Sequence, residues 1–442
     1  MIVPIDKAAG NVAFICKRFY AKVILDELGL RQEGGSSTYT EADEDCHTII
    51  NKHNNFLRDK FGFINPESNN KLPGIYWLPK LHKSPIKFRF IIAAPECSIK
   101  PLARSITSIF KLFQRQICTY NEISSFYSGI KTFWVIQDNN AVLKKMKYLS
   151  NHRKAISMET FDFSTLYTKI PHDKLTDVLC KLVDFCFEGG SHDWIFTNDW
   201  GARWVLDPST YDFVYDKPKI KLAIRYLMSN CYFTFGNRVF RQIIGIPMGS
   251  DPAPFFANLF LYHYESKWIK NLQRVDIVRA RKFSLIFRFI DDLLTLNDGG
   301  EFARSFREIY PPELELNKEN EGAEKASFLD LDNEIVDRKI STSLFDKRDA
   351  FPSSIVRMPF LCSNIPSNMF YFSFGAEILR IARVSSSRDN FITASKTLVN
   401  RITAQGGKID RMKRVLRKIF ANHSESFAHI SNEVTTLFCI FS

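Results

Sequence analysis

Two apolar segments of this 442-residue chain carry acidic residues where buried strands are expected. Asp162 lies in ETFDFSTLYTKIP, and Asp291 and Asp292 lie next to each other in FRFIDDLLTL. Ionised carboxylates beside a sheet interior are costly unless a counter-charge compensates them. Mg²⁺ would compensate them, because it prefers oxygen ligands and is usually held by one or two carboxylates together with substrate phosphates. The two segments therefore favour a fold that brings three carboxylates together around divalent cations.

The order of the elements around these carboxylates narrows the fold class. Apolar spacing and turn residues predict strands, helices and hairpins in a definite order. The expected elements are a strand over 157–162, a helix over 172–186, a hairpin at Gly236-Asn237, a helix over 252–268 and a hairpin with Asp291 and Asp292 at its bend. A strand with a carboxylate, a glycine-rich turn and a hairpin with two carboxylates follow one another as the palm of a polymerase requires. We therefore expect an α+β fold built on an antiparallel sheet.

Composition and charge indicate a globular protein with a polyanionic partner. The chain is 45% hydrophobic and 24% charged, which is typical of globular proteins. Its 60 Lys and Arg exceed its 48 Asp and Glu, and the net charge of +12 favours nucleic acid. The nine cysteines include no C-x-x-C pair, so we expect neither a zinc site nor a disulfide framework, and we infer an intracellular, reducing compartment. No apolar stretch reaches the roughly 20 residues that span a bilayer, so no membrane partner is expected.

Local changes in composition indicate how the chain is organised. Residues 73–115 carry eight Lys and Arg against one acid, and residues 376–420 carry eleven against three, so both regions are expected to face a polyanion. Residues 188–218 contain three of the six Trp and are predicted as an insertion. The remaining predicted elements are one strand near the N-terminus, helices over 21–30, 46–61 and 99–118, two strands flanking Ser84-Pro85, two strands over 327–335 and 339–345, and helices towards the C-terminus.

Taken in order, the motifs resemble those of reverse transcriptases, most closely the enzymes of Penelope-like retroelements, which are related to telomerase reverse transcriptase. VPIDKAAGNV is similar to an Asp-Lys-Gly element in front of the polymerase, and LPKLHK and FRFIIAAP resemble fingers motifs. ETFDFSTLYTKIP, GIPMGSDPAPFFANLF and FRFIDDLLTL are similar to three successive palm motifs. The resemblance implies a right-hand polymerase with fingers, an antiparallel-sheet palm and a helical thumb. It divides the chain into an N-terminal region over 1–70, fingers over 71–156, a palm over 157–350 and a thumb over 351–442.

The resemblance also implies which residues carry out nucleotidyl transfer. Asp162 and Asp291 would coordinate two Mg²⁺ ions, for which Mn²⁺ would substitute, and Asp292 would complete the catalytic carboxylates. Two such ions stabilise the attacking and leaving oxygens of an in-line displacement. Lys318 would protonate the leaving pyrophosphate as a general acid. Lys325 is an alternative for this role, and Lys318 is equally well explained as a solvated loop lysine.

Further residues are assigned to the nucleotide through the same resemblance. Arg89 and Lys87 would bind the triphosphate, because a guanidinium matches phosphate oxygens in bidentate fashion. Tyr167 would lie under the sugar, where it would exclude a 2′-hydroxyl and favour deoxynucleotides. Gly249 would lie close to the nucleotide. The alternatives are a general nucleic-acid-facing surface for the two cations and a core position for the tyrosine ring.

Two regions are assigned to the template–primer by the resemblance. The turn within GIPMGS would let the backbone approach the nascent base pair, because glycine allows close contact. The basic C-terminal region would grip the nucleic-acid backbone through salt-dependent, sequence-independent contacts. The residues assigned to the template–primer are Gly245, Pro247, Ser250, Arg411, Lys413, Arg414 and Arg417. An ordinary turn and a solvated helix face are the corresponding alternatives.

These assignments predict an RNA-directed DNA polymerase that extends a DNA primer with dNTPs on an RNA template. An RNA-dependent RNA polymerase is the alternative within the enzyme class, and Tyr167 argues against it. A catalytically inactive or domesticated remnant that only binds nucleic acid is the alternative outside that class. Nothing before Ser442 resembles the GIY-YIG endonuclease of most Penelope-like proteins, so we expect either a variant that works with a separate endonuclease as partner or a truncated copy. Nuclear localisation is expected from the family.

Overall fold

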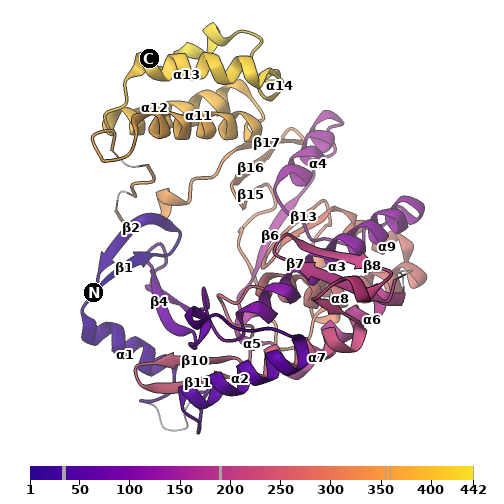
Figure 1. Ribbon diagram of the computed structural model, residues 1–442. Helices are drawn as coiled ribbons and strands as arrows, with labels where there is room; N and C mark the ends of the chain where they lie inside the picture. Colours follow the sequence, from indigo (N-terminus) through magenta and orange to yellow (C-terminus); the bar gives the residue numbers. More distant parts are fainter. Residues whose placement is uncertain (32–35, 189–191, 354, 359, 442) are drawn as a thin grey trace.

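The computed structural model of the chain describes residues 1–31, 36–188, 192–353, 355–358 and 360–441. Within these residues the strands form five sheets, and the C-terminal region is helical (Figure 1). The α+β architecture expected from the sequence is confirmed. Residues 189–191 of the predicted insertion lie outside the described residues.

The central sheet has four antiparallel strands with helices packed on one face. In spatial order the strands are β12 (Ile286–Phe289), β13 (Asp292–Leu296), β6 (Met158–Phe163) and β14 (Leu316–Lys318). The helices are α3 (Lys100–Ser128), α6 (His172–Glu188), α8 (Ala253–Val275) and α10 (Glu301–Ile309). Because side chains alternate along a strand, Phe161 and Phe163 pack among these helices, whereas Met158 belongs to a second core on the opposite face. The strand and the two helices predicted around Asp162 and the glycine-rich turn are confirmed.

A second sheet combines strands that lie far apart in the sequence. In spatial order they are β3 (Tyr39–Glu41), β11 (Arg238–Gln242), β10 (Tyr232–Phe235), β4 (Gly74–Lys80) and β5 (Lys87–Ala93). The predicted hairpin at Gly236-Asn237 is confirmed as β10–β11. It pairs with β3 and β4, so residues 232–242 of the predicted palm belong to the sheet of the predicted fingers. Local patterning does not indicate this pairing, because tertiary packing selects the partners of a strand.

The N-terminal region forms a hairpin instead of the single predicted strand, and the helix predicted over 21–30 is confirmed with slightly earlier bounds. β1 (Ile2–Ile5) pairs with β2 (Ala8–Phe14), and α1 (Lys17–Glu27) follows. The turn is Asp6-Lys7, which lacks the Asn-Gly type of signal that marks a two-residue hairpin turn. Tyr20 of α1 stacks on Trp77 of β4 with ring centroids 4.6 Å apart. This contact fastens the N-terminal region to the second sheet.

The predicted insertion over 188–218 contains a small sheet of its own. Its strands are β7 (Trp194–Asn198), β8 (Gly201–Val205) and β9 (Val214–Tyr215). The sheet packs against α3 and buries Ile195 and Tyr215 in the large core. The insertion is therefore folded against the large core.

The segment predicted as one strand over 327–335 is divided between two strands. β15 (Lys325–Phe328) and β16 (Leu331–Val336) are separated by a turn, and β17 (Lys339–Leu344) completes an antiparallel sheet. Leu329 in that turn adopts φ +57°. Since a leucine rarely takes this conformation, the residue pattern gave no sign of the turn.

The predicted helical character of the C-terminal region is confirmed. Its helices are α11 (Ser367–Val384), α12 (Arg388–Ala404), α13 (Ile409–Asn422) and α14 (Ser424–Phe427). Their apolar side chains, among them Phe374 and Leu416, form a core separate from that of the central sheet. The Thr342 hydroxyl of β17 donates a hydrogen bond to the Val384 carbonyl at 2.7 Å. The β15–β17 sheet therefore connects the C-terminal helices to the rest of the chain (Figure 1).

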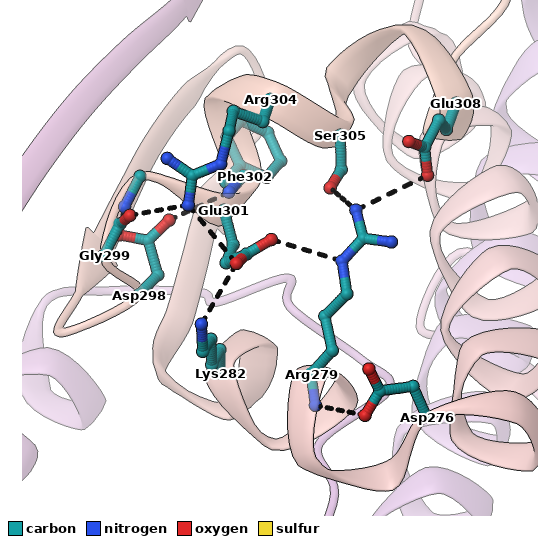
Figure 2. A network of polar contacts seen from close by, with 11 residues as sticks. Asp276, Arg279, Lys282, Asp298, Gly299, Glu301, Phe302, Arg304, Ser305 and Glu308 are labelled. Atoms are coloured by element: carbon teal, nitrogen blue, oxygen red, sulfur yellow. Dashed lines mark hydrogen bonds and ion pairs between the residues drawn. The ribbon is translucent and has the colours of Figure 1, made fainter.

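An ion-pair network fixes the start of α10, the helix that follows the carboxylate hairpin. Glu301 accepts ion pairs from Arg279, Lys282 and Arg304 (Figure 2). These contacts, of which the hydrogen bond from Lys282 is the strongest, lower the pKa of Glu301 to about 2. The network joins α10 to α9 (Ile277–Lys282) and so supports the sheet from the helical side.

Arg288 of β12 is fully buried and forms a bidentate ion pair with Glu265 of α8. Its Nε and Nη2 atoms lie 2.7 and 3.1 Å from the two Glu265 carboxylate oxygens. Its Nη1 donates to the Asn258 side-chain oxygen at 2.9 Å and to the Ile290 carbonyl at 3.0 Å. The Tyr310 hydroxyl donates to Glu265 Oε1 at 2.7 Å. The network therefore ties α8 to the turn between β12 and β13.

Replacing Arg288 with Met is expected to destabilise the chain strongly, because it leaves Glu265 charged and buried without its partner. Removing one member of a buried pair costs about 3–5 kcal/mol, which urea denaturation would register as a large fall in the midpoint. The exposed Arg274 offers a matched control, and Arg274→Met should change the stability by less than about 0.5 kcal/mol. Equal midpoints for the two variants would contradict the role given to the buried pair.

Candidate active site

The paired strands bring the three predicted carboxylates to one end of the central sheet. Asp162 of β6 lies directly opposite Asp292 of β13, so their side chains share one face. Asp291 lies in the turn before β13, and its carbonyl accepts a hydrogen bond from the Phe163 amide at 3.1 Å. Asp291 alone is at the bend, since Asp292 already pairs with Phe289 in the ladder. This strand pairing thus brings together Asp162 and Asp291, which are 129 positions apart in the sequence.

The turn that carries Asp291 has an unusual backbone. Ile290 adopts φ +56°, which is a rare conformation for a β-branched residue. The buried Arg288 donates to the Ile290 carbonyl and holds this conformation in place. Backbone strain of this kind concentrates at functional sites, where the surrounding structure maintains it.

The carboxylates are partly buried and repel one another. Burial raises the pKa of Asp162 above its usual value, and the charges of Asp291 and Glu319 raise it further. Burial, reinforced by the charge of Asp291, raises the pKa of Asp292 to about 6. Within the described part of the chain, none of these three aspartates has a side-chain hydrogen bond or ion pair. A divalent cation would relieve the repulsion, so the donor set fits the expected Mg²⁺ ions.

These carboxylates do not by themselves form a metal cage. Among the residues that the structure describes, no group of three or more His, Cys, Asp or Glu side chains has the arrangement of a metal site. Mg²⁺ is commonly held by one or two carboxylates and completed by substrate phosphates. Asp162 and Asp291 are the candidates for such shared coordination, and the metal ions stay a prediction.

The carboxylates line a cavity of about 940 Å³ that is also lined by basic side chains. The palm contributes acidic side chains and also the cations Lys325 and Lys347, the N-terminal region contributes Lys7 and Glu27, and the fingers contribute further cations. The charged lining residues include Asp162, Asp291, Asp292 and Glu319 on the one hand, and Lys7, Lys80, His82, Lys83 and Arg89 on the other. Opposed charges of this kind suit a triphosphate that binds metal ions with one side and cations with the other.

The structure separates the two predicted triphosphate ligands. Arg89 lines the cavity, and its Nη1 lies 3.1 Å from Asp6 Oδ1. Lys87 is exposed at the start of β5 and is absent from the described lining of this cavity. Tyr167 lines the cavity, and burial together with the charge of Asp291 raises the pKa of its phenol. Arg89 and Tyr167 are thus in the cavity with the carboxylates, and Lys87 is not.

Lys318 faces away from the catalytic carboxylates. It lies opposite Phe161 in the β14–β6 ladder, so it shares the helix-covered face of the sheet with that residue. Its Nζ forms an ion pair with Glu159 Oε1 at 2.5 Å. Lys325, the alternative general acid, lines the cavity and pairs with Glu334 at 2.9 Å. The side-chain alternation of β14 therefore places the predicted general acid on the wrong face for that role.

The predicted glycine-rich turn forms hydrogen bonds with the palm on one side and with the fingers on the other. The Gly245 amide donates to the Ile170 carbonyl at 2.8 Å, and His172 Nε2 contacts the Gly245 carbonyl at 2.7 Å. From the other side, the Ile92 amide of β5 donates to the Met248 carbonyl at 2.9 Å. The turn consequently fixes the second sheet against the carboxylate-bearing one.

Glycine is required at two positions of this turn. Gly245 and Gly249 have φ values of +87° and +112°. An added Cβ would lie 2.4 Å from the Tyr167 carbonyl oxygen at Gly245 and 2.4 Å from the Ile92 carbonyl oxygen at Gly249. Both the conformation and the close approach exclude a side chain.

Pro247 and Ser250 have structural contacts within the same turn. The Ser250 hydroxyl donates to the Pro247 carbonyl at 3.1 Å. Both residues line a smaller, largely apolar cavity instead of the catalytic one. Their predicted role at the template–primer therefore depends on the backbone of the turn and stays a prediction.

The predicted thumb cations lie on α13, where aromatic rings of the thumb contact three of them. Arg414 is exposed on the same helix. The cation–ring contacts are Arg411 over Tyr371 at 4.4 Å, Lys413 over Phe441 at 5.8 Å and Arg417 over Phe438 at 4.8 Å. These contacts orient the side chains on the thumb surface. Their binding to a template–primer stays a prediction.

Two residues that line the cavity, Lys7 and His82, and the partner of Arg89, Asp6, were not singled out from the sequence. Asp6 and Lys7 come from the N-terminal hairpin, and His82 follows β4. A signal existed, because DKAAG and LPKLHK are the segments that resemble family motifs in front of the palm. The residue pattern alone does not show that these segments and the carboxylates line one cavity, since Lys7 and His82 lie 155 and 80 positions before Asp162.

The fold of the chain is similar to that of solved telomerase structures. Telomerase from Candida albicans, in complex with the TWJ fragment of telomeric RNA, aligns with 100% of this chain and 70% of its own, at 10% identity and a TM-score of 0.63. Telomerase from Candida tropicalis with the TWJ fragment aligns with 99% of this chain and 67% of its own, at 14% identity and a TM-score of 0.50. The chain matches no protein-family model and no curated protein.

The chain has a reverse-transcriptase-like, right-hand polymerase fold. The Candida albicans alignment extends over its whole length, which agrees with the expected α+β palm, fingers and thumb. At 10% identity the likeness shows the fold alone, so the chemistry has to be argued from the site. No helix in the described ranges is long and apolar enough to cross a membrane.

Substituting alanine for Gly249 is expected to destabilise the chain and to disturb the site, because the new Cβ would collide with the backbone of β5. Thermal denaturation should show a loss of about 2 kcal/mol or more. Gly62→Ala is a matched control, since Gly62 has φ +74° and open space around its Cα. It should cost only the strain of about 1 kcal/mol. A Gly249→Ala loss no larger than that of the control would contradict the clash.

Proposed function

We propose that this chain is an RNA-directed DNA polymerase of a Penelope-like retroelement that extends a DNA 3′-hydroxyl with dNTPs. The observation that carries the proposal is the register of Asp162 and Asp292, which sit beside Asp291 in a cavity that also contains Arg89. Carboxylates for metal ions together with cations for a triphosphate are what nucleotidyl transfer requires. A polymerase fold without such a site would support only nucleic-acid binding.

In this proposal the residues of the cavity position the reactants. Arg89 binds the triphosphate, and Tyr167 lies under the sugar. The turn at Gly249 brings the backbone close to the nascent base pair. Asp162 and Asp291 hold two Mg²⁺ ions, which stabilise charge on the attacking and leaving oxygens. The palm and fingers are held together by the same turn, so these positions are set before the nucleotide binds.

Sequence resemblance and the fold together support an RNA template and a retroelement origin. Telomerase from Candida albicans, whose fold this chain shares, was solved with a fragment of telomeric RNA. The segments DKAAG and LPKLHK, which resemble Penelope-like motifs, contribute Lys7, Lys80 and His82 to the cavity. A nuclear location follows from that origin.

Primer extension on an RNA template annealed to a DNA primer tests the activity. We expect extension with dNTPs and Mg²⁺, and with Mn²⁺ in its place. Asp291→Asn preserves the shape of the side chain and removes its charge, so it should lower the rate at least about a thousandfold. The exposed Asp59 gives a matched control, and Asp59→Asn should extend like the wild type.

Two outcomes would contradict the proposed activity. Extension by Asp291→Asn at the wild-type rate would mean that the carboxylates are not the catalytic ones. Folded wild-type protein that binds the RNA–DNA duplex in a salt-sensitive way but extends no primer would favour the nucleic-acid-binding remnant.

Tyr167→Ala tests the preference for deoxynucleotides and the alternative of an RNA-dependent RNA polymerase. Removal of the ring should open space for a 2′-hydroxyl, and the ratio of kcat/KM for dNTPs to that for rNTPs should fall at least about tenfold. Single-nucleotide incorporation with matched dNTP and rNTP pairs measures this ratio. If the wild type already prefers rNTPs, or if the variant keeps the wild-type ratio, the role given to Tyr167 is wrong.

A further inference from the structure

The N-terminal hairpin reaches the catalytic cavity and adds a charge to its basic side. The turn Asp6-Lys7 joins β1 to β2, and Lys7 lines the cavity together with Arg89 of β5. Lys7 and Lys83 lower the pKa of Asp162, in opposition to the effect of burial. The Lys7 ammonium group on the hairpin and the carboxylates of the palm therefore line the same cavity.

Two contacts place this hairpin firmly. The Asp6 amide donates to the Pro79 carbonyl of β4 at 3.1 Å. Asn11 of β2 donates to the Val356 carbonyl at 2.7 Å and accepts a hydrogen bond from the Val356 amide at 3.1 Å. Figure 1 shows the hairpin between β4 and the segment that leads up to the thumb helices. The turn is consequently a fixed part of the cavity and not a loose terminus.

Lys7 has a backbone conformation that is unfavourable for a residue with a side chain. Lys7 has φ +61° and is exposed. This left-handed conformation is unfavourable for any residue with a Cβ, and glycine would adopt it without strain. Strained residues of this kind cluster at ligand sites. A lysine at this position places a cation in the cavity at the expense of backbone stability.

Asp6 controls the direction of the Arg89 guanidinium. The Asp6 side chain is 4% exposed, and its Oδ1 lies 3.1 Å from Arg89 Nη1, whereas the Arg89 side chain remains 37% exposed. One nitrogen is held in this way, so the guanidinium keeps other donors for a second anion. Both ring nitrogens of His82 are buried without a hydrogen-bond partner among the described residues, and this ring lines the same cavity. The basic side of the cavity thus has hydrogen-bond donors, on Arg89 and His82, that the described residues do not use.

We propose that Lys7 binds the triphosphate of the incoming nucleotide and that Asp6 is a positioning residue that fixes Arg89 for the same ligand. This inference rests on the polymerase function proposed above and makes the N-terminal hairpin part of the nucleotide site. A triphosphate fits better than a nucleic-acid backbone, because these cations share one cavity with the carboxylates that would hold its metal ions. The triphosphate oxygens also supply the acceptors that the unused donors need.

Lys7→Gly is the sharpest variant, because glycine suits φ +61° and the substitution removes the exposed side chain together with its charge. In single-nucleotide incorporation we expect the KM for the dNTP to rise about tenfold. The kcat and the Kd for the RNA–DNA template–primer should stay as in the wild type, and Lys7→Arg should restore most of the lost affinity. Arg338→Gly is the matched control, since Arg338 is also exposed at φ +61° and does not line the cavity.

Two results would overturn the role of Lys7. One is a KM for the dNTP in Lys7→Gly that equals that of the Arg338→Gly control. The other is weaker template–primer binding with an unchanged KM, because the turn would then contact nucleic acid instead of the nucleotide.

Calorimetric titration with dATP and Mg²⁺ separates this inference from the polymerase function. A wild-type chain that incorporates no nucleotide contradicts the polymerase function, yet dATP binding that weakens in Lys7→Gly still supports the triphosphate site. Equal dATP affinity in the wild type and in Lys7→Gly overturns that site, whether or not the chain polymerises.

A double-mutant cycle tests whether Asp6 acts through Arg89. Asp6→Asn should raise the KM for the dNTP in the wild-type background and have no further effect on it in the Arg89→Ala background. A purely structural role of Asp6 gives the same rise in both backgrounds, and that result would overturn the positioning role. Thermal denaturation of each variant establishes that it is folded.

Discussion

A buried arginine, Arg288, supports the turn between β12 and β13, in which Asp291 lies next to Asp292. Arg288 uses its whole guanidinium in the protein interior: two nitrogens contact Glu265, and the third contacts the carbonyl of Ile290. A buried charge such as that of Arg288 is stable only when all of its hydrogen-bond donors have partners. These partners fix the positions of α8, β12 and the turn relative to one another. The left-handed backbone of Ile290 is maintained by this arrangement. The position of Asp291 therefore depends on an ion pair that lies outside the cavity.

Charge separation across the cavity is the second organising feature. The palm contributes carboxylates that repel each other, and the fingers and N-terminal hairpin contribute cations that also repel each other. Among the cations, Arg89 is held by an ion pair with the buried Asp6. A ligand that combines divalent cations with phosphates would neutralise both groups at once. The glycine-rich turn keeps the two sides at a constant separation because backbone contacts to Gly245 and Met248 fix it from both.

Sequence reasoning located most elements of the palm and the carboxylates. Alternating and helical apolar patterns are local, so the strand before Asp162 and the helices after it could be recognised from a few residues. It failed where the backbone takes an unexpected conformation, as at Leu329 and in the Asp6-Lys7 turn. It also failed for Lys318, because the face on which a short strand presents its side chains depends on its register with β6. Lys87 and Arg89 are two residues apart, yet only the structure shows that one of them lines the cavity.

The sequence by itself determined which chemical groups are available: two carboxylate-bearing apolar segments, a glycine-rich turn and a basic balance of charge. It also determined an α+β fold, because hydrophobic periodicity acts over a few residues. Only the tertiary structure decided which of these groups meet. Strand pairing placed Asp162 opposite Asp292, and the N-terminal hairpin brought Lys7 to the same cavity. Such pairings are selected by packing and ion pairs between residues far apart in the chain, for which a single sequence carries no local signal.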